Sequence, residues 1–140
     1  MDFLTKQRNA LQSERIVKLV KFGIVGASGL VVNNGILWVL VYSGMFDLVA
    51  SIIATEAAII TNFIGNSIWT WKDHAGGSWR RRFIMFQGIS VFAAVFTVAL
   101  FWTLHNVVGM PLLIANTTAI FITFLINFTL NHKFTWKVEQ

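Results

Sequence analysis

The chain alternates between long apolar stretches and short segments that hold its charges. Four stretches approach or exceed the roughly 20 apolar residues that cross a bilayer core as a helix; they lie at about 22–43, 48–69, 83–108 and 111–131. All eleven Lys and Arg residues fall before, between or after the two pairs of stretches, and none lies in the short links 43–47 and 108–111. Cationic segments stay in the cytoplasm. The pattern predicts an all-α integral protein of the cell membrane with four transmembrane helices and both termini cytoplasmic.

Composition agrees with this interpretation. Apolar residues make up 56% of the chain and charged residues 12%, whereas soluble domains average roughly 45–50% and 25%. The net charge of +5 comes from residues that flank helices, which favours anionic lipids over nucleic acid as a partner. The chain has no Cys, its three His residues have no metal-ligand spacing, and no nucleophile has a base beside it. We therefore expect no enzyme activity, metal or cofactor.

The basic segment 1–21 allows two interpretations, a short interfacial helix on the cytoplasmic leaflet or a frayed polar tail. Glu14 and Lys18 are four residues apart, as in a helical ion pair. Aromatic residues near the expected span ends are typical of a membrane-interface belt; they are Trp38, Tyr42 and Trp102 at the outer side, and Trp69, Trp71, Trp79 and Trp136 at the inner side.

The sequence also repeats itself at an offset of 65 residues. Residues 44–72 match 109–137 at 11 of 29 positions, and the matches include two Asn, a Trp and a Lys that shared hydrophobicity does not explain. We interpret this as an internal duplication with units at about 21–72 and 86–137, followed by a tail at 138–140. A two-helix unit returns to its starting side, so the repeats are expected to be parallel about an axis along the membrane normal.

The repeated Asn pairs are the main candidate site. Asn62 and Asn66 lie one turn apart on the second helix, and Asn127 and Asn131 do so on the fourth, so each pair shares a face. Interhelical hydrogen bonds in membranes average only about 0.6 kcal/mol. Two interpretations remain open: the amides hold helices together, or they line a cytoplasmic cleft that binds a polar headgroup with nearby Lys72, Lys133 and Lys137.

Three further features carry candidate chemistry. Glu56 is the one acid deep inside a span, where ionisable residues are functional by default, and Asn33 or Asn34 is a possible neighbour on the first helix. The run Arg80–Arg82 either fixes topology or contacts lipid phosphate or a partner protein. Four glycines of the first helix predict a small-residue face for close helix approach; they are Gly23, Gly26, Gly29 and Gly35.

Residues 17–137 resemble the GtrA-like family and the membrane part of dolichol-phosphate-mannose-synthase-like proteins. The resemblance rests on the segment from Phe22 to Asn33, on Ala54-Thr-Glu56, on the Asn-Phe and Trp-Thr-Trp elements near Asn62, on Arg81-Arg-Phe83, and on the segment from Asn127 to Trp136. It implies a four-helix module that works with a membrane glycosyltransferase on a polyprenyl-phosphate-linked sugar. Fused relatives carry the transferase domain, so we expect a separate enzyme here. Asn33 stands where many members have Asp.

We therefore predict a protein that translocates or helps to handle a polyprenyl-phosphate-linked sugar. The alternative is a scaffold that docks the glycosyltransferase without transport; a small exporter or channel is disfavoured because the first helix has no acid. A homo-oligomer is compatible with four short helices. The predicted substrate-binding residues are Asn33, Glu56, Asn62, Asn66, Lys72, Arg81, Arg82, Asn127, Asn131, Lys133 and Lys137.

Overall fold

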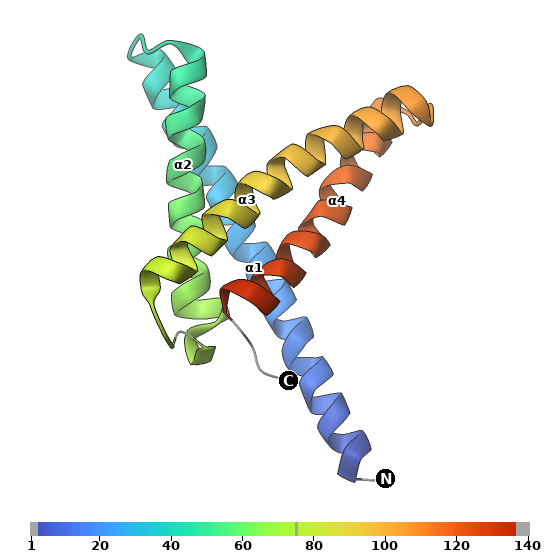
Figure 1. The fold of residues 1–140 in the computed structure, drawn as a ribbon. Helices are drawn as coiled ribbons and strands as arrows, with labels where there is room; N and C mark the ends of the chain where they lie inside the picture. The colour runs from blue at the N-terminus through green and yellow to red at the C-terminus, as the bar shows by residue number, and fades with distance from the viewer. Residues whose placement is uncertain (1–2, 75, 137–140) are drawn as a thin grey trace. The chain divides into compact units, whose positions relative to one another are not determined.

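A computed structural model describes residues 3–74 and 76–136, and all regular structure within these ranges is helical (Figure 1). The chain forms two compact units, Met1–Ala75 and Gly76–Gln140. The first unit contains helices α1 (Phe3–Tyr42) and α2 (Asp47–Gly65), a π-helical turn η1 (Asn66–Thr70) and a 3-10 turn η2 (Lys72–His74). The second contains α3 (Trp79–Trp102), η3 (Thr103–Val107), α4 (Leu112–Leu130) and η4 (Asn131–Thr135), with η3 and η4 π-helical.

Among the described residues, four segments are long and apolar enough to cross a membrane; they are Thr5–Tyr42, Asp47–Thr70, Trp79–Val107 and Leu112–Thr135. This confirms the predicted all-α, multi-pass membrane protein. Many large apolar side chains on the outer faces are exposed, for example Leu30, Val31 and Ile52. A helix that spans a bilayer presents such residues to lipid.

The N-terminal segment is helical, so the frayed-tail interpretation is wrong, whereas its location at the membrane interface stays a prediction. α1 is one continuous helix of 40 residues, about 60 Å long at 1.5 Å per residue, which is twice the roughly 30 Å bilayer core. Phe3 to Phe22 contains neither Gly nor Pro, so nothing in the backbone interrupts the helix where the polar segment meets the span. The segment is therefore an extension of the first transmembrane helix.

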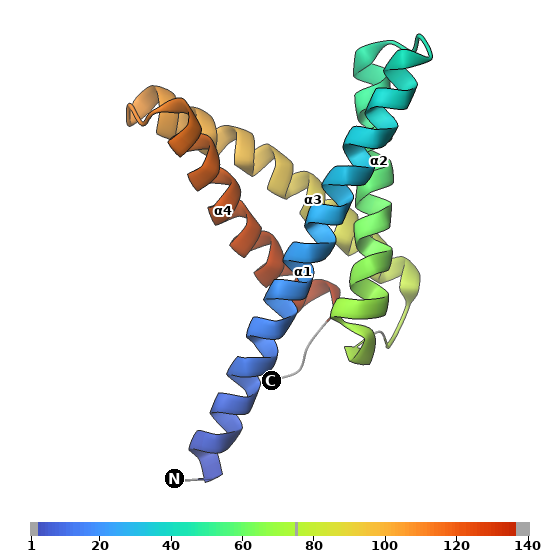
Figure 2. The same cartoon turned by 180° about the vertical axis from the view of Figure 1, so that it is seen from behind.

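Each unit is a pair of neighbouring helices joined by a tight turn, as Figures 1 and 2 show for α1 and α2. Gly44 and Gly109 adopt φ of 89° and 80°, a conformation that other residues reach only with strain. At the first turn, Gly44 N–H donates to Val41 O and Met45 N–H donates to Leu40 O, at 3.0 and 3.1 Å. This is a Schellman cap, in which the residue with positive φ is usually Gly.

Small side chains allow the helices of each pair to approach closely. Along α2, Ala50, Ala54 and Ala58 are buried, and along α4 the buried residues at the same spacing are Ala115, Ala119 and Thr123. A four-residue spacing keeps each set on one helix face. The predicted glycine face of α1 is only partly confirmed: Gly29 is buried, whereas Gly26 and Gly35 are exposed and a Cβ added to them would contact nothing within 4 Å.

Two tryptophans expected in the interface belt are instead buried at the ends of the helix pairs opposite the Gly-Met turns. Trp71 is fully buried and Trp136 is 3% exposed. Trp71 packs edge-on against Phe22, with ring centroids 5.7 Å apart, and Trp136 packs in the same way against Phe86 at 5.7 Å. Trp38, Trp69, Trp79 and Trp102 are exposed, as belt residues should be.

These contacts also correct the register of the repeat. Trp71 and Trp136 are 65 residues apart, but their partners Phe22 and Phe86 are 64 apart. The first helices therefore correspond at an offset of 64, which also places Lys18 opposite Arg82 and Gly29 opposite Ala93. The contacts agree with the predicted duplication, which stays an interpretation.

Candidate functional site

The polar residues at the end of α2 are buried but incompletely bonded. Asn66 is 1% exposed, and its Oδ1 accepts a hydrogen bond from Thr70 Oγ1 at 2.7 Å. Asn66 Nδ2 and Asn62 Oδ1 are buried without a hydrogen-bond partner among the described residues. Buried polar groups are bonded in the great majority of proteins. The first unit therefore holds one buried donor and one buried acceptor that no described residue satisfies.

Gly29 creates the space that Asn62 occupies. A Cβ placed on Gly29 would lie 2.1 Å from Asn62 Oδ1 and 2.5 Å from Nδ2, closer than any stable contact. Glycine at this position therefore lets the Asn62 amide lie directly against the α1 backbone.

Further along the same helices, Asn33 Nδ2 donates to Thr55 Oγ1 at 3.3 Å. Glu56, the next residue of α2, is half-buried. The structure thus brings Asn33 to α2 at the depth predicted for Glu56. At the outer end, a groove of about 550 Å³ includes Asn34, Asp47 and Ser51 in its lining.

The matching amides of the second unit bond to each other. Asn131 is completely buried; its Nδ2 donates to Asn127 Oδ1 at 2.8 Å and to Asn127 O at 3.0 Å, and its Oδ1 accepts from Thr135 Oγ1 at 2.8 Å. These bonds join residues of one continuous helical segment, so they satisfy the amides without linking α4 to another helix. Both interpretations of the Asn pairs stay predictions. At the position that corresponds to Gly29, the second unit has Ala93, which is buried.

The predicted cationic residues occupy different environments. Lys72 and Lys133 are exposed, and the Lys133 ammonium lies 5.5 Å from the Phe134 ring centroid. Arg81 is exposed and donates through Nη2 to Phe134 O at 3.4 Å. Arg82 is 8% exposed, and its Nε and Nη1 are buried without a hydrogen-bond partner among the described residues. Lys137 lies outside the described residues.

The predicted site residues thus divide between the units. Asn33, Glu56, Asn62, Asn66 and Lys72 belong to the first, and the second contains Arg81, Arg82, Asn127, Asn131 and Lys133. A single cleft formed by the second and fourth helices stays a prediction.

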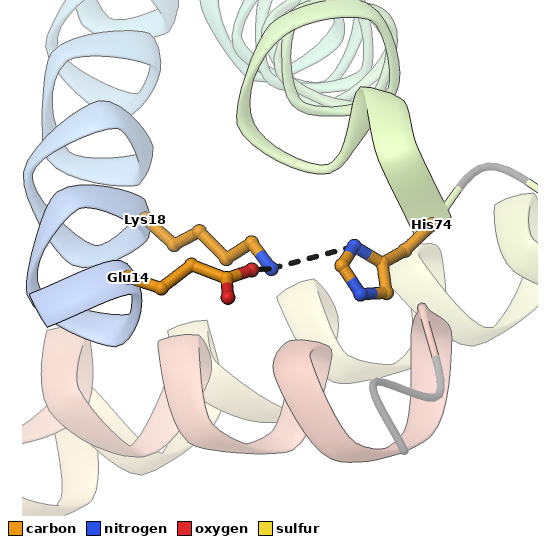
Figure 3. A network of polar contacts seen from close by, with 3 residues as sticks. All are labelled: Glu14, Lys18 and His74. Carbon is orange, nitrogen blue, oxygen red and sulfur yellow. Dashed lines mark hydrogen bonds and ion pairs between the residues drawn. The ribbon is translucent and has the colours of Figure 1, made fainter. Parts of the chain in front are cut away.

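Sequence reasoning missed the polar network of Glu14, Lys18 and His74 in the first unit (Figure 3). Lys18 is 5% exposed; its Nζ pairs with Glu14 Oε1 at 2.5 Å and lies 3.3 Å from His74 Nδ1. The spacing of Glu14 and Lys18 was visible in the sequence, but the contribution of His74, 56 residues further on, was not.

Thr70 and Thr135 were missed as well. Each donates its hydroxyl to the Asn four residues earlier, at 2.7 and 2.8 Å. Both stretches are π-helical, a wider turn that often occurs at functional sites. The recurrence of Asn-x-x-x-Thr-Trp in the repeat was the available signal.

Residues 21–136 match the family described as GtrA/DPMS, transmembrane domain. The chain therefore belongs to this family, as its sequence resemblance indicated. A curated relative, a dolichol-phosphate mannosyltransferase from Pyrococcus furiosus, is 39% identical over 121 residues, which cover 86% of this chain and 34% of the relative. The chain spans about a third of the relative's length.

Proposed function

We propose that this protein moves a polyprenyl-phosphate-linked sugar across the membrane, in partnership with the glycosyltransferase that makes it. The family match and a relative named for dolichol phosphate support this class of lipid. The proposed contacts for the sugar are Asn62, Asn66 and Glu56. Lys72, Lys133, Lys137, Arg81 and Arg82 would counter phosphate charge.

The observation that carries the proposal is a polar stripe along α2. Asp47, Ser51, Thr55, Asn62 and Asn66 are separated by four, four, seven and four residues, a spacing that keeps them on one helix face. They extend over about 28 Å at 1.5 Å per residue, close to the roughly 30 Å bilayer core. Asn33 joins the stripe through Thr55, and Asn34 shares the groove with Asp47 and Ser51.

The matching positions of the second unit do not form such a stripe, because Leu112 and Ile120 interrupt it. A headgroup that crosses the bilayer needs polar contacts at every depth, since an unpaired polar group in hydrocarbon is costly. A docking scaffold needs polar groups only at the cytoplasmic end. The full-length stripe therefore favours translocation over the scaffold.

The proposed orientation has both termini in the cytoplasm, because the turns at Ser43 and Val108 carry no Lys or Arg. An impermeant thiol reagent applied to intact cells checks it. Cysteine at Ser43 or Val108 should react from outside, and cysteine at Ser78 should not. The reverse labelling pattern would show that the termini lie outside the cell.

The function is tested in vesicles that contain the protein and a labelled polyprenyl-phosphate sugar. The wild-type protein should accelerate transbilayer movement, and Glu56→Gln, which removes the charge but keeps the size, should slow it. Asp73→Asn makes the same chemical change at an exposed position in η2 and should have no effect. If the wild-type protein fails to accelerate movement but raises the activity of the transferase, the scaffold is the correct function.

A further inference from the structure

The ends of the two units that contain the Phe–Trp contacts have the same arrangement of residues. In the first unit, Glu14, Lys18 and Phe22 follow at four-residue spacing on α1, and Phe22 packs against Trp71. In the second, Ser78, Arg82 and Phe86 follow at the same spacing, and Phe86 packs against Trp136. Lys18 and Arg82 are both buried cations, 5% and 8% exposed.

The two cations differ in their counter-charge. Lys18 pairs with the Glu14 carboxylate, but the matching residue of the second unit is Ser78, whose Oγ instead accepts the Arg81 N–H at the start of α3, at 3.4 Å. Residues 76–136 contain Arg80, Arg81, Arg82 and Lys133, and no Asp or Glu. Two of the three guanidinium nitrogens of Arg82 are buried without a hydrogen-bond partner among the described residues.

A buried charge is strongly unfavourable unless it is paired and hydrogen-bonded. We propose that Arg82 binds the phosphate of a membrane ligand, with the second unit holding the anion. The planar guanidinium suits phosphate oxygens, and Arg82 lies in the first turn of α3, at the depth where a lipid phosphate meets the cytoplasmic interface. The identity of the ligand as a polyprenyl phosphate rests on the proposed function; the anion site itself does not.

The test measures binding of three probes to the purified full chain in nanodiscs: a polyprenyl phosphate, the uncharged polyprenol of the same length, and inorganic phosphate. The wild-type protein should prefer the polyprenyl phosphate to the polyprenol. Arg82→Gln should weaken polyprenyl phosphate binding by about 10- to 100-fold, the range expected for losing a hydrogen bond to a charged group. Arg80→Gln removes the same charge from an exposed neighbour and should change the affinity by less than about 3-fold.

A second variant keeps Arg82 and therefore does not depend on the folding of Arg82→Gln. Ser78→Asp retains a good helix cap and introduces a carboxylate four residues before Arg82, as Glu14 stands before Lys18. It should raise the melting temperature without ligand and weaken polyprenyl phosphate binding. Ser78→Asn, which caps without charge, should behave as the wild-type protein does.

The possible outcomes separate the anion site from the proposed function. Equal affinity of folded Arg82→Gln and wild-type protein for polyprenyl phosphate would overturn the site and leave the function standing. If only inorganic phosphate stabilises the wild-type protein, in an Arg82-dependent manner, the site stands and the lipid assignment falls. Glu139 lies outside the described residues; if Glu139→Gln destabilises the protein and its effect is not additive with Arg82→Gln, Arg82 has an internal partner and the site is wrong.

Discussion

The two units share their framework but differ in which polar groups lack partners. In the first, the cation Lys18 is paired with Glu14, whereas Asn62 Oδ1 and Asn66 Nδ2 have no partner among the described residues. In the second, Asn127 and Asn131 bond to each other, whereas two nitrogens of Arg82 are unpartnered in the described part of the chain. Recurrence of a residue type therefore does not imply recurrence of its role.

Two differences in sequence account for the contrast. Glu14 corresponds to Ser78, so the second cation lacks the carboxylate that pairs with Lys18. Gly29, whose missing Cβ leaves room for the Asn62 amide, corresponds to Ala93. Each unit thus offers a different kind of group without a partner among the described residues: a cation in the second and amide groups in the first.

The largest effect should come from the packing that both units share. Trp71→Ala and Trp136→Ala each remove a buried indole from an edge-on contact with a Phe ring, so each should lower the free energy of unfolding by about 3–5 kcal/mol. Unfolding in mixed micelles measures this.

Trp102→Ala is the matched control, because Trp102 is exposed; it should cost less than about 1 kcal/mol. If Trp71→Ala lowers the free energy of unfolding and Trp136→Ala does not, the two units do not depend on equivalent Phe–Trp packing.

A smaller effect should follow when the first unit is converted toward the second. Gly29→Ala places a methyl group where the Asn62 amide lies, so the amide should turn toward Asn66, as Asn127 bonds to Asn131. Stability should change by no more than about 1 kcal/mol, because alanine's higher helix propensity offsets the displacement. Affinity for the polyprenyl-phosphate sugar should fall.

Gly26→Ala is the control for this substitution, because the added Cβ contacts nothing within 4 Å. It should leave binding unchanged. Full retention of sugar-lipid affinity in Gly29→Ala would show that the position of the Asn62 amide does not matter.

The fold followed from the sequence because its main signals are local. Span length, the placement of Lys and Arg, and the Gly-Met turns depend on hydrophobicity and backbone conformation. The uninterrupted α1 was missed because a polar segment before a span suggests a boundary, whereas only Gly or Pro would have broken the helix. The burial of Trp71 depends on its contact with Phe22, which is distant in the sequence. A Trp near the end of a span looks the same in the sequence whether it is buried or lies in the interface belt.

The site was predictable only in part for the same reason. The Asn pairs and Arg82 were identified from their repetition and charge density. Which of their groups are bonded depends on contacts across each helix pair, such as Gly29 against Asn62. Glu14 and Lys18 were visible as a helical pair, but the comparison with Ser78 and Arg82 needed the 64-residue register that the Phe–Trp contacts supply.

Substitution of the Asn residues should give the smallest change in stability. It also tests most directly whether the amides of the two units have different roles. Asn127→Leu should cost up to about 0.6 kcal/mol, the average for an interhelical hydrogen bond in a membrane, because it removes the side-chain acceptor of Asn131 Nδ2 but keeps the Asn127 O acceptor. Asn62→Leu should cost nothing, because Asn62 Oδ1 has no hydrogen-bond partner among the described residues.

The decisive measurement compares the affinities of both variants for a polyprenyl-phosphate sugar and for the plain polyprenyl phosphate. Asn62→Leu should weaken binding of the sugar-bearing lipid by about 3- to 10-fold and leave the plain phosphate unchanged, whereas Asn127→Leu should change neither. Equal losses in the two variants, or no loss of sugar-lipid affinity in Asn62→Leu, would contradict the assignment of the sugar to the first unit.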